Sequence, residues 1–146
     1  MTYAQLLSRY RDKHGTLVEP PQGFDSLHED LWLAYSIGIK RGYYSVGTYA
    51  RKPGDHSWGD RNGQPGVALA FDLRRKGWVG RFGWRFANAK KLARFYWANH
   101  KALNLNYVIV GRQIISRQYP TWRPYTRDSS HDWHIHVSGS EPDDSL

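Results

Sequence analysis

Three histidines lie within six residues near the C-terminal end of the chain, at His131, His134 and His136. In an extended strand the side chains of residues i and i+2 project from the same face, so His134 and His136 would point together. Trp133, Ile135 and Val137 alternate with them and would form an apolar face on the other side of the strand. A polar loop of solvated imidazoles needs no metal, but this apolar alternation favours a strand that carries half of a metal site.

A catalytic zinc ion needs three protein ligands and one open position for water. The chain contains no cysteine, so its ligands must be nitrogen or oxygen atoms. His56 in a turn-rich segment and Asp72 at the end of an alternating strand are the best further ligands. Taken alone, Asp72 fits a turn cap or an ion pair and His56 fits a solvated loop. Together they predict a set of His56, Asp72 and one histidine of the C-terminal pair, with the other histidine free for proton transfer.

The pattern of apolar and turn residues predicts the elements that must position these side chains. Helices are expected at residues 2–13 with Thr2 as N-cap, from Asp25 or Ser26 to about Gly42, and at residues 86–103. Strands are expected at residues 43–49, 67–72, 106–110, 113–116 and in the histidine segment, with a turn-rich stretch at 51–66 and a loop at 119–127. About three helices and several hairpin-connected strands favour an α+β fold with a mostly antiparallel sheet.

Length and charge limit the possible functions. The 146 residues fit a single domain, which we place at 1–138, followed by a flexible acidic tail at 139–146. The net charge of +8 indicates an anionic partner such as nucleic acid, a membrane surface or a cell-wall polymer. We find neither a membrane span nor a signal peptide, which predicts a protein that is cytoplasmic at synthesis.

Three motifs in this order resemble a known family. They are Gly54-Asp55-His56, then Gly66-Val67-Ala68-Leu69-Ala70-Phe71-Asp72-Leu73, then His131-x-x-His134-x-His136-Val137-Ser138. Over about residues 40–138 the chain is similar to the zinc D-Ala-D-Ala metallopeptidases, and most to small actinobacterial and phage domains related to them. The resemblance implies the hedgehog-like fold of these peptidases, with Zn²⁺ bound by His56, Asp72 and His136. It further implies that His134 is the catalytic histidine and that His131 supports it or the developing charge.

The chain departs from the family pattern in two places. Fifteen residues separate His56 from Asp72, more than in the better-known members, so Asp55 or Asp60 could replace His56 as a ligand. A histidine stands where many relatives have a glutamate as general base, and it is chemically adequate because its ordinary pKa is near neutrality. Arg51, just before the first motif, is the candidate for binding a substrate carboxylate in a bidentate manner.

The resemblance implies hydrolysis of an amide bond in peptidoglycan stem or crosslink peptides. An anionic cell wall would attract the basic chain, and phage lysis or cell-wall degradation by a phage-encoded monomer, released to or delivered at the wall, follows as the expected role. One alternative is a basic aromatic nucleic-acid-binding module, since residues 74–85 and 119–125 interleave basic and aromatic side chains. It is disfavoured because no known nucleic-acid motif is present. The other alternative is a relative that binds the wall without catalysis.

Overall fold

The computed structural model describes residues 1–142, whose strands form one six-stranded sheet. The strand order is β1-β2-β6-β3-β4-β5, and every neighbouring pair is antiparallel. The strands are β1 (Tyr44–Gly47), β2 (Ala70–Arg74), β3 (Leu105–Val110), β4 (Gln113–Ser116), β5 (Arg123–Pro124) and β6 (Ile135–Gly139). The predicted α+β class with an antiparallel sheet is confirmed.

The α-helices are α1 (Tyr3–His14), α2 (Trp32–Lys40) and α3 (Gly83–Ala98). Thr2 caps α1 as predicted, because its hydroxyl accepts from the Gln5 N–H while the Gln5 side chain accepts from the Thr2 N–H. Shorter 3₁₀ helices are η1 (Phe24–Ser26), η2 (Glu29–Leu31), η3 (Asp55–Arg61) and η4 (Ser129–Asp132). Within the described residues, no helix is both long enough and apolar enough to cross a membrane.

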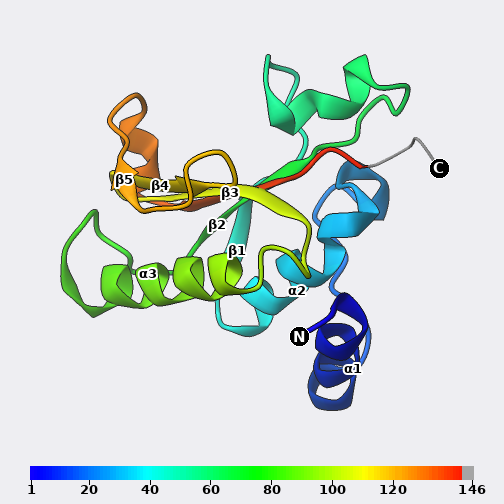
Figure 1. Ribbon diagram of the computed structural model, residues 1–146, viewed down its shortest axis with the longest axis horizontal. Helices are drawn as coiled ribbons and strands as arrows, with labels where there is room; N and C mark the ends of the chain where they lie inside the picture. Colours follow the sequence, from blue (N-terminus) through cyan, green and yellow to red (C-terminus); the bar gives the residue numbers. More distant parts are fainter. Residues whose placement is uncertain (143–146) are drawn as a thin grey trace.

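The two faces of the sheet have different partners. Helices α2 and α3 lie along one face, and the segments around η3 and η4 rise on the other (Figure 1). On the helix side Phe71 packs edge-on against Tyr35 of α2 and Tyr96 of α3, and the Tyr96 hydroxyl donates to the Ala34 carbonyl at 2.7 Å. Because side chains alternate along a strand, the core on one face leaves the opposite positions of β2, β6 and β3 free for polar residues.

Some predicted boundaries differ from the observed ones. The second helix does not run from Asp25 but is split into η1, η2 and α2, because His28 Nδ1 accepts from the Asp30 N–H and starts a new turn. The turn-rich stretch at 51–66 contains the irregular helix η3. The third helix begins and ends earlier than predicted, at Gly83 and Ala98. Gly139, the first residue of the predicted tail, is the last residue of β6, and residues 143–146 lie outside the described residues.

Candidate metal centre

The polar face of the sheet gathers charged side chains from neighbouring strands. Asp72 of β2 stands opposite His136 of β6, which in turn stands opposite Ile109 of β3. Tyr107, two residues before Ile109, projects from the same face. The register therefore brings together a carboxylate, an imidazole and a phenol from three strands that are distant in sequence.

A further segment brings His56 onto this face. Helix η3 is tied to the residue just before β2, because the Leu69 N–H donates to the Asp55 carbonyl at 2.8 Å. The His56 ring is oriented by its Nδ1–H, which donates to the Thr48 carbonyl at 2.6 Å. The long stretch between His56 and Asp72 is thus occupied by η3 and an anchored turn, and it still delivers the two side chains to one place.

Asp72 is the common partner of three imidazoles. One carboxylate oxygen lies 3.1 Å from His56 Nε2, and the other lies 2.8 Å from His136 Nδ1 and 3.5 Å from His134 Nε2. Gly47 is paired with Asp72 on β1, and a Cβ at that position would lie 3.0 Å from the Asp72 Oδ2. Glycine there leaves the carboxylate room to face the histidines.

His136 is held from its other side by Asp55. Its Nε2 lies 3.1 Å from Asp55 Oδ2, and the Tyr107 hydroxyl donates to the same oxygen at 2.6 Å. The Tyr107 ring also stacks on the His136 ring, with centroids 5.4 Å apart. The buried His136 ring therefore has a carboxylate at each nitrogen.

The electrostatics of this cluster favour positive charge on His136. Burial alone lowers the pKa of His136, but hydrogen bonds to Asp55 and Asp72 outweigh it and raise the pKa to about 9. Burial likewise raises the pKa of both carboxyl groups, and the opposing hydrogen bonds and charge of His136, with His56 acting on Asp72, hold both below the ordinary range. The two carboxylates are ionised at neutral pH and create a site that attracts cations.

The donor atoms fit a metal ion. Ligand atoms of Asp55, His56 and His136 lie within 4.8 Å of one another, so this buried group can hold one. The hydrogen bond to Thr48 places the Nδ1 proton of His56, so in the neutral ring Nε2 directs a lone pair at the Asp72 carboxylate 3.1 Å away. Two acceptors facing each other need a proton or a metal cation between them. The nitrogen and oxygen donors suit first-row divalent ions.

His131 and His134 line the same pocket. Burial, opposed by the charge of Asp72, lowers the pKa of His134 to about 4, so the ring is neutral at pH 7. Burial also lowers the pKa of His131, whose Nδ1–H donates to the Asp128 carbonyl at 3.2 Å. The two ring centroids are 4.8 Å apart. The pocket of about 290 Å³ is thus lined by neutral imidazoles beside a charged cluster.

The segment that leads into η3 lines two pockets. Lys52 and Pro53 line both the metal pocket and an adjacent cleft, whereas Arg51 is exposed and lines only the cleft, together with Asp60. Asp60 accepts from the Tyr49 hydroxyl at 2.7 Å and from the Gly66 N–H at 2.9 Å. Of the two aspartates considered as replacements for His56, Asp55 lies in the cluster and Asp60 does not.

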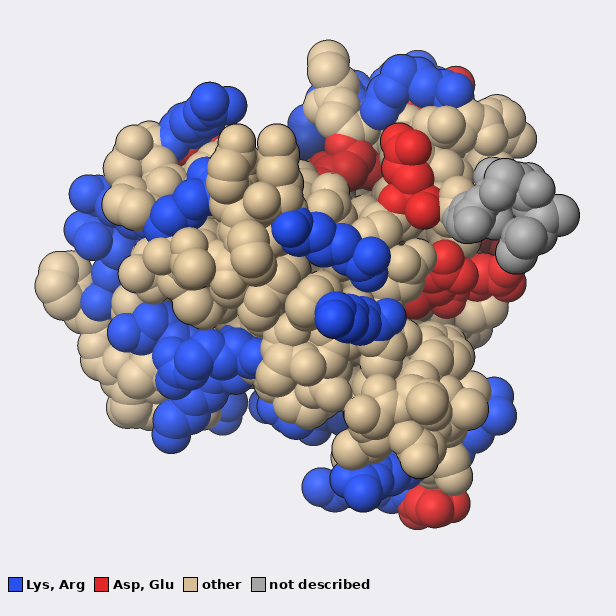
Figure 2. Space-filling view, in the orientation of Figure 1, with Lys and Arg blue, Asp and Glu red and all other residues tan. Residues whose placement is uncertain are grey.

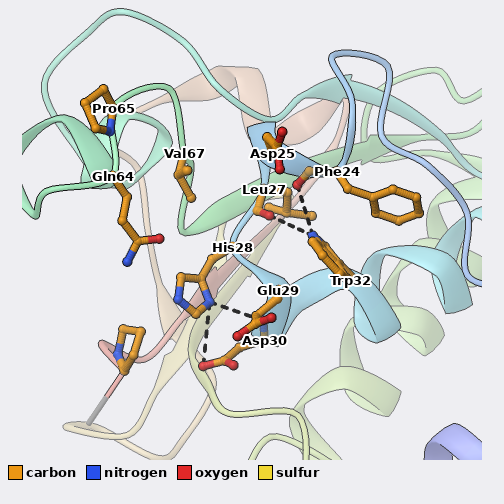
Figure 3. Close-up of a pocket in the computed structure, with 11 residues that line it drawn as sticks. Phe24, Asp25, Leu27, His28, Glu29, Asp30, Trp32, Gln64, Pro65 and Val67 are labelled. Carbon is orange, nitrogen blue, oxygen red and sulfur yellow. Dashed lines mark hydrogen bonds and ion pairs between the residues drawn. The ribbon is translucent and has the colours of Figure 1, made fainter. Parts of the chain in front are cut away.

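A second pocket, of about 840 Å³, lies among residues 24–32, 64–67 and Pro142. It contains His28 with Asp25, Glu29 and Asp30, but these side chains come from one short stretch of chain (Figure 3). His28 Nδ1 accepts from the Asp30 N–H at 3.2 Å, which is a local turn contact. The larger cavity therefore lacks the convergence of distant carboxylates and imidazoles seen at Asp72.

Sequence reasoning did not single out Tyr107, Lys52 or the Thr48 carbonyl. Tyr107 lies in a strand that the sequence predicts, where it precedes the core residue Val108, but the pairing of that strand with the histidine segment is seen only in the structure. No sequence pattern marks a backbone carbonyl as a histidine partner. Comparison of the chain with family models, with curated proteins and with solved structures finds no match in any of the three.

Proposed function

We propose that this chain is a zinc-dependent peptidase that hydrolyses an amide bond in peptidoglycan stem or crosslink peptides. The observation that carries the proposal is that His56 and His136 both contact the Asp72 carboxylate, with His131 and His134 beside them. The three motifs that resemble the zinc D-Ala-D-Ala metallopeptidases contribute all five of these side chains. The peptidoglycan substrate rests on that resemblance and on the basic charge of the chain.

His56, Asp72 and His136 are the proposed zinc ligands, in preference to the set that contains Asp55. Asp72 contacts both histidines, whereas Asp55 contacts His136 and Tyr107. With Asp72 as ligand, each ligand histidine keeps a partner for its other nitrogen, the Thr48 carbonyl for His56 and Asp55 for His136. Such partners fix the orientation of metal-binding imidazoles. A bound Zn²⁺ supplies a water of pKa about 7 and polarises the substrate carbonyl.

His134 carries the proton transfers, and His131 supports it. The His134 ring is neutral at neutral pH, because burial lowers its pKa to about 4, so one of its two nitrogens is an acceptor. It takes a proton from the attacking water and returns it to the nitrogen of the leaving amine, which balances the hydrolysis of one amide bond. His131 is a positioning residue that packs on the His134 ring and helps to keep it neutral.

The basic residues just before the first motif are proposed to bind the substrate carboxylate. Arg51 remains the candidate for a bidentate contact, and Lys52 is a cation that lines the metal pocket. Both lie in the segment that leads into η3.

The proposal is tested with zinc content and cleavage measured on the same preparations. We expect wild-type protein to retain about one zinc per chain and to cut purified muropeptides, with products identified by mass spectrometry. His136→Ala should lose both zinc and cleavage, whereas His134→Gln should keep zinc and lose cleavage. His100→Ala is the matched control. The His100 ring stacks on the Trp97 ring, with centroids 3.8 Å apart, and does not line the metal pocket. If His136→Ala has the same zinc content as the wild type, the proposed metal site is wrong. If the wild-type protein contains zinc but cuts no muropeptide, the protein is a binding protein and not a peptidase.

A further inference from the structure

The positive charge of the chain is concentrated in one stretch. Residues 73–127 contain thirteen of the 21 Lys and Arg residues and none of the 13 Asp and Glu residues. The remainder of the chain has more acidic than basic residues. Figure 2 shows Lys and Arg gathered over the part of this face where α3 and its preceding loop lie in Figure 1, with most of the acidic atoms toward the other side. An anionic partner would be attracted to the basic side.

The loop between β2 and α3 presents apolar side chains on this basic side. Val79 and Phe82 in the loop and Trp84 in the first turn of α3 are 63%, 78% and 56% exposed. We call these three residues the apolar tip. Large apolar side chains exposed singly are common, but three exposed within six residues of one loop and helix start indicate an interaction site.

The loop that carries the apolar tip is firmly anchored. Trp78 is fully buried, and its Nε1–H donates to the Gly80 carbonyl at 2.7 Å. Arg74 donates to the Trp78 carbonyl at 2.9 Å. Gly77 has a φ of 82°, and a Cβ there would lie 2.7 Å from Arg85 Nε, so a side chain would displace the turn. The exposed residues are therefore held outward by a defined backbone.

Basic side chains surround the apolar tip. Arg75 and Arg85 lie over the Trp84 ring at 5.2 and 4.5 Å, and Lys76 is exposed. Arg81 reaches Asp132 at 3.5 Å, which places the loop beside the η4 turn that carries His131. Aromatic and aliphatic residues flanked by cations are the composition that binds the interface of an anionic bilayer.

We propose that the apolar tip inserts into the headgroup region of an anionic phospholipid bilayer while the surrounding Lys and Arg residues bind the lipid phosphates. A membrane fits these residues better than a nucleic-acid strand does. Val79 cannot stack on a base, and the Trp84 ring already has two guanidinium groups over it. The proposal does not depend on catalysis by the metal pocket, although Arg81 and Asp132 would bring that pocket close to the bilayer.

Sedimentation of the full chain with vesicles tests the proposal. We expect binding to vesicles of phosphatidylcholine with phosphatidylglycerol, little binding to phosphatidylcholine alone, and release by salt. Phe82→Ser should weaken binding about tenfold, because an inserted ring is lost. Lys76→Gln should weaken it about fivefold, the effect of one cation near an anionic surface.

Matched controls remove the same kinds of side chain elsewhere. Val46→Ser deletes an exposed apolar residue of β1, and Lys13→Gln deletes an exposed cation of α1, and neither should change vesicle binding by more than about twofold. Far-ultraviolet circular dichroism shows that each variant is folded. Equal binding to neutral vesicles, or an equal loss in the control variants, overturns the proposal. Tight binding of a single-stranded oligonucleotide without vesicle binding also overturns it and assigns the basic side to nucleic acid.

Discussion

The metal pocket and the larger pocket beside α2 contain the same residue types in different arrangements. In the metal pocket Asp72 meets His136, which is 64 residues away in sequence, and Asp55 meets the same ring from 81 residues away. In the larger pocket His28 meets its near neighbour Asp30, and Asp25 and Glu29 are exposed. The first arrangement depends on the fold, whereas the second can form in a short turn.

The two pockets therefore differ in their electrostatics: charge interactions are strong in the metal pocket and weak in the larger pocket. Burial lowers the pKa of His136, but its hydrogen bonds to Asp55 and Asp72 and their charges raise it to about 9, so the folded chain retains a proton that an exposed imidazole would release. The larger pocket leaves its carboxylates in water, where solvent screens their charge. Cavity volume is thus a poor guide here, and the convergence of buried opposite charges is a better one.

The largest expected effect comes from removing the common carboxylate. Asp72→Ala should lower zinc affinity more than about 100-fold, because a ligand contributes more than the residues that orient ligands. Asp30→Ala, the corresponding change in the larger pocket, should leave the affinity unchanged. Competition with a chromophoric chelator measures both. Equal losses in the two variants would show that the two pockets do not differ as argued.

The next largest effect is the pH dependence of zinc binding in the metal pocket. Zinc must displace the proton of His136, whose pKa is about 9, so affinity should rise about tenfold per pH unit between about pH 6.5 and 9. His134, with a pKa of about 4, is already neutral throughout this window.

The metal-free protein should show the opposite trend in stability. A folded-state pKa raised above the unfolded value stabilises the protein fully below about pH 6.5, and this contribution is lost as the pH rises toward 9. Thermal denaturation across this pH range, with and without zinc, tests both the predicted rise in zinc affinity and the predicted fall in the stability of the metal-free protein. His136→Gln should abolish the slope and His28→Ala should retain it. A slope that persists in His136→Gln would assign the proton to another group.

Asp55 gives a smaller effect and decides between the two possible ligand sets. Asp55 orients His136, so Asp55→Asn should lower zinc affinity between about 10- and 100-fold. Tyr107→Phe, which removes the other donor to Asp55, serves as a graded comparison. If Asp55→Asn eliminates zinc binding while Asp72→Ala retains it, the ligands are Asp55, His56 and His136.

The elements around the site were largely predictable from the sequence. The alternation of Ile135 and Val137 with the histidines placed His134 and His136 on one side, and the hairpin at residues 106–116 was predicted by its central Gly111-Arg112. The observed register of β2 and β6, which sets Asp72 opposite His136, depends on long-range pairing that no local pattern encodes.

The partners of the ligand residues were less predictable. The Thr48 carbonyl becomes a partner of His56 only through the path of the chain into η3, and Asp55 contacts His136 because η3 lies over the sheet. The sequence also favoured Arg51 for the substrate, whereas in the fold Lys52 lines the metal pocket and Arg51 lines only the adjacent cleft. Side-chain direction in an irregular segment depends on tertiary contacts and not on residue type.

The smallest effect concerns these two neighbouring cations. Lys52→Ala should raise KM for a muropeptide with a free carboxylate about fivefold with little change in kcat, because a solvated ionic contact acts on ground state and transition state alike. Arg51→Ala should raise KM less if its side chain remains in the adjacent cleft, and Glu29→Gln in the larger pocket should not change it. Steady-state kinetics on amidated and free-acid substrates isolate the contribution of the carboxylate. A larger KM effect in Arg51→Ala would mean that the segment turns on substrate binding and presents the guanidinium, and an effect in Glu29→Gln would give the larger pocket a role in binding the peptide.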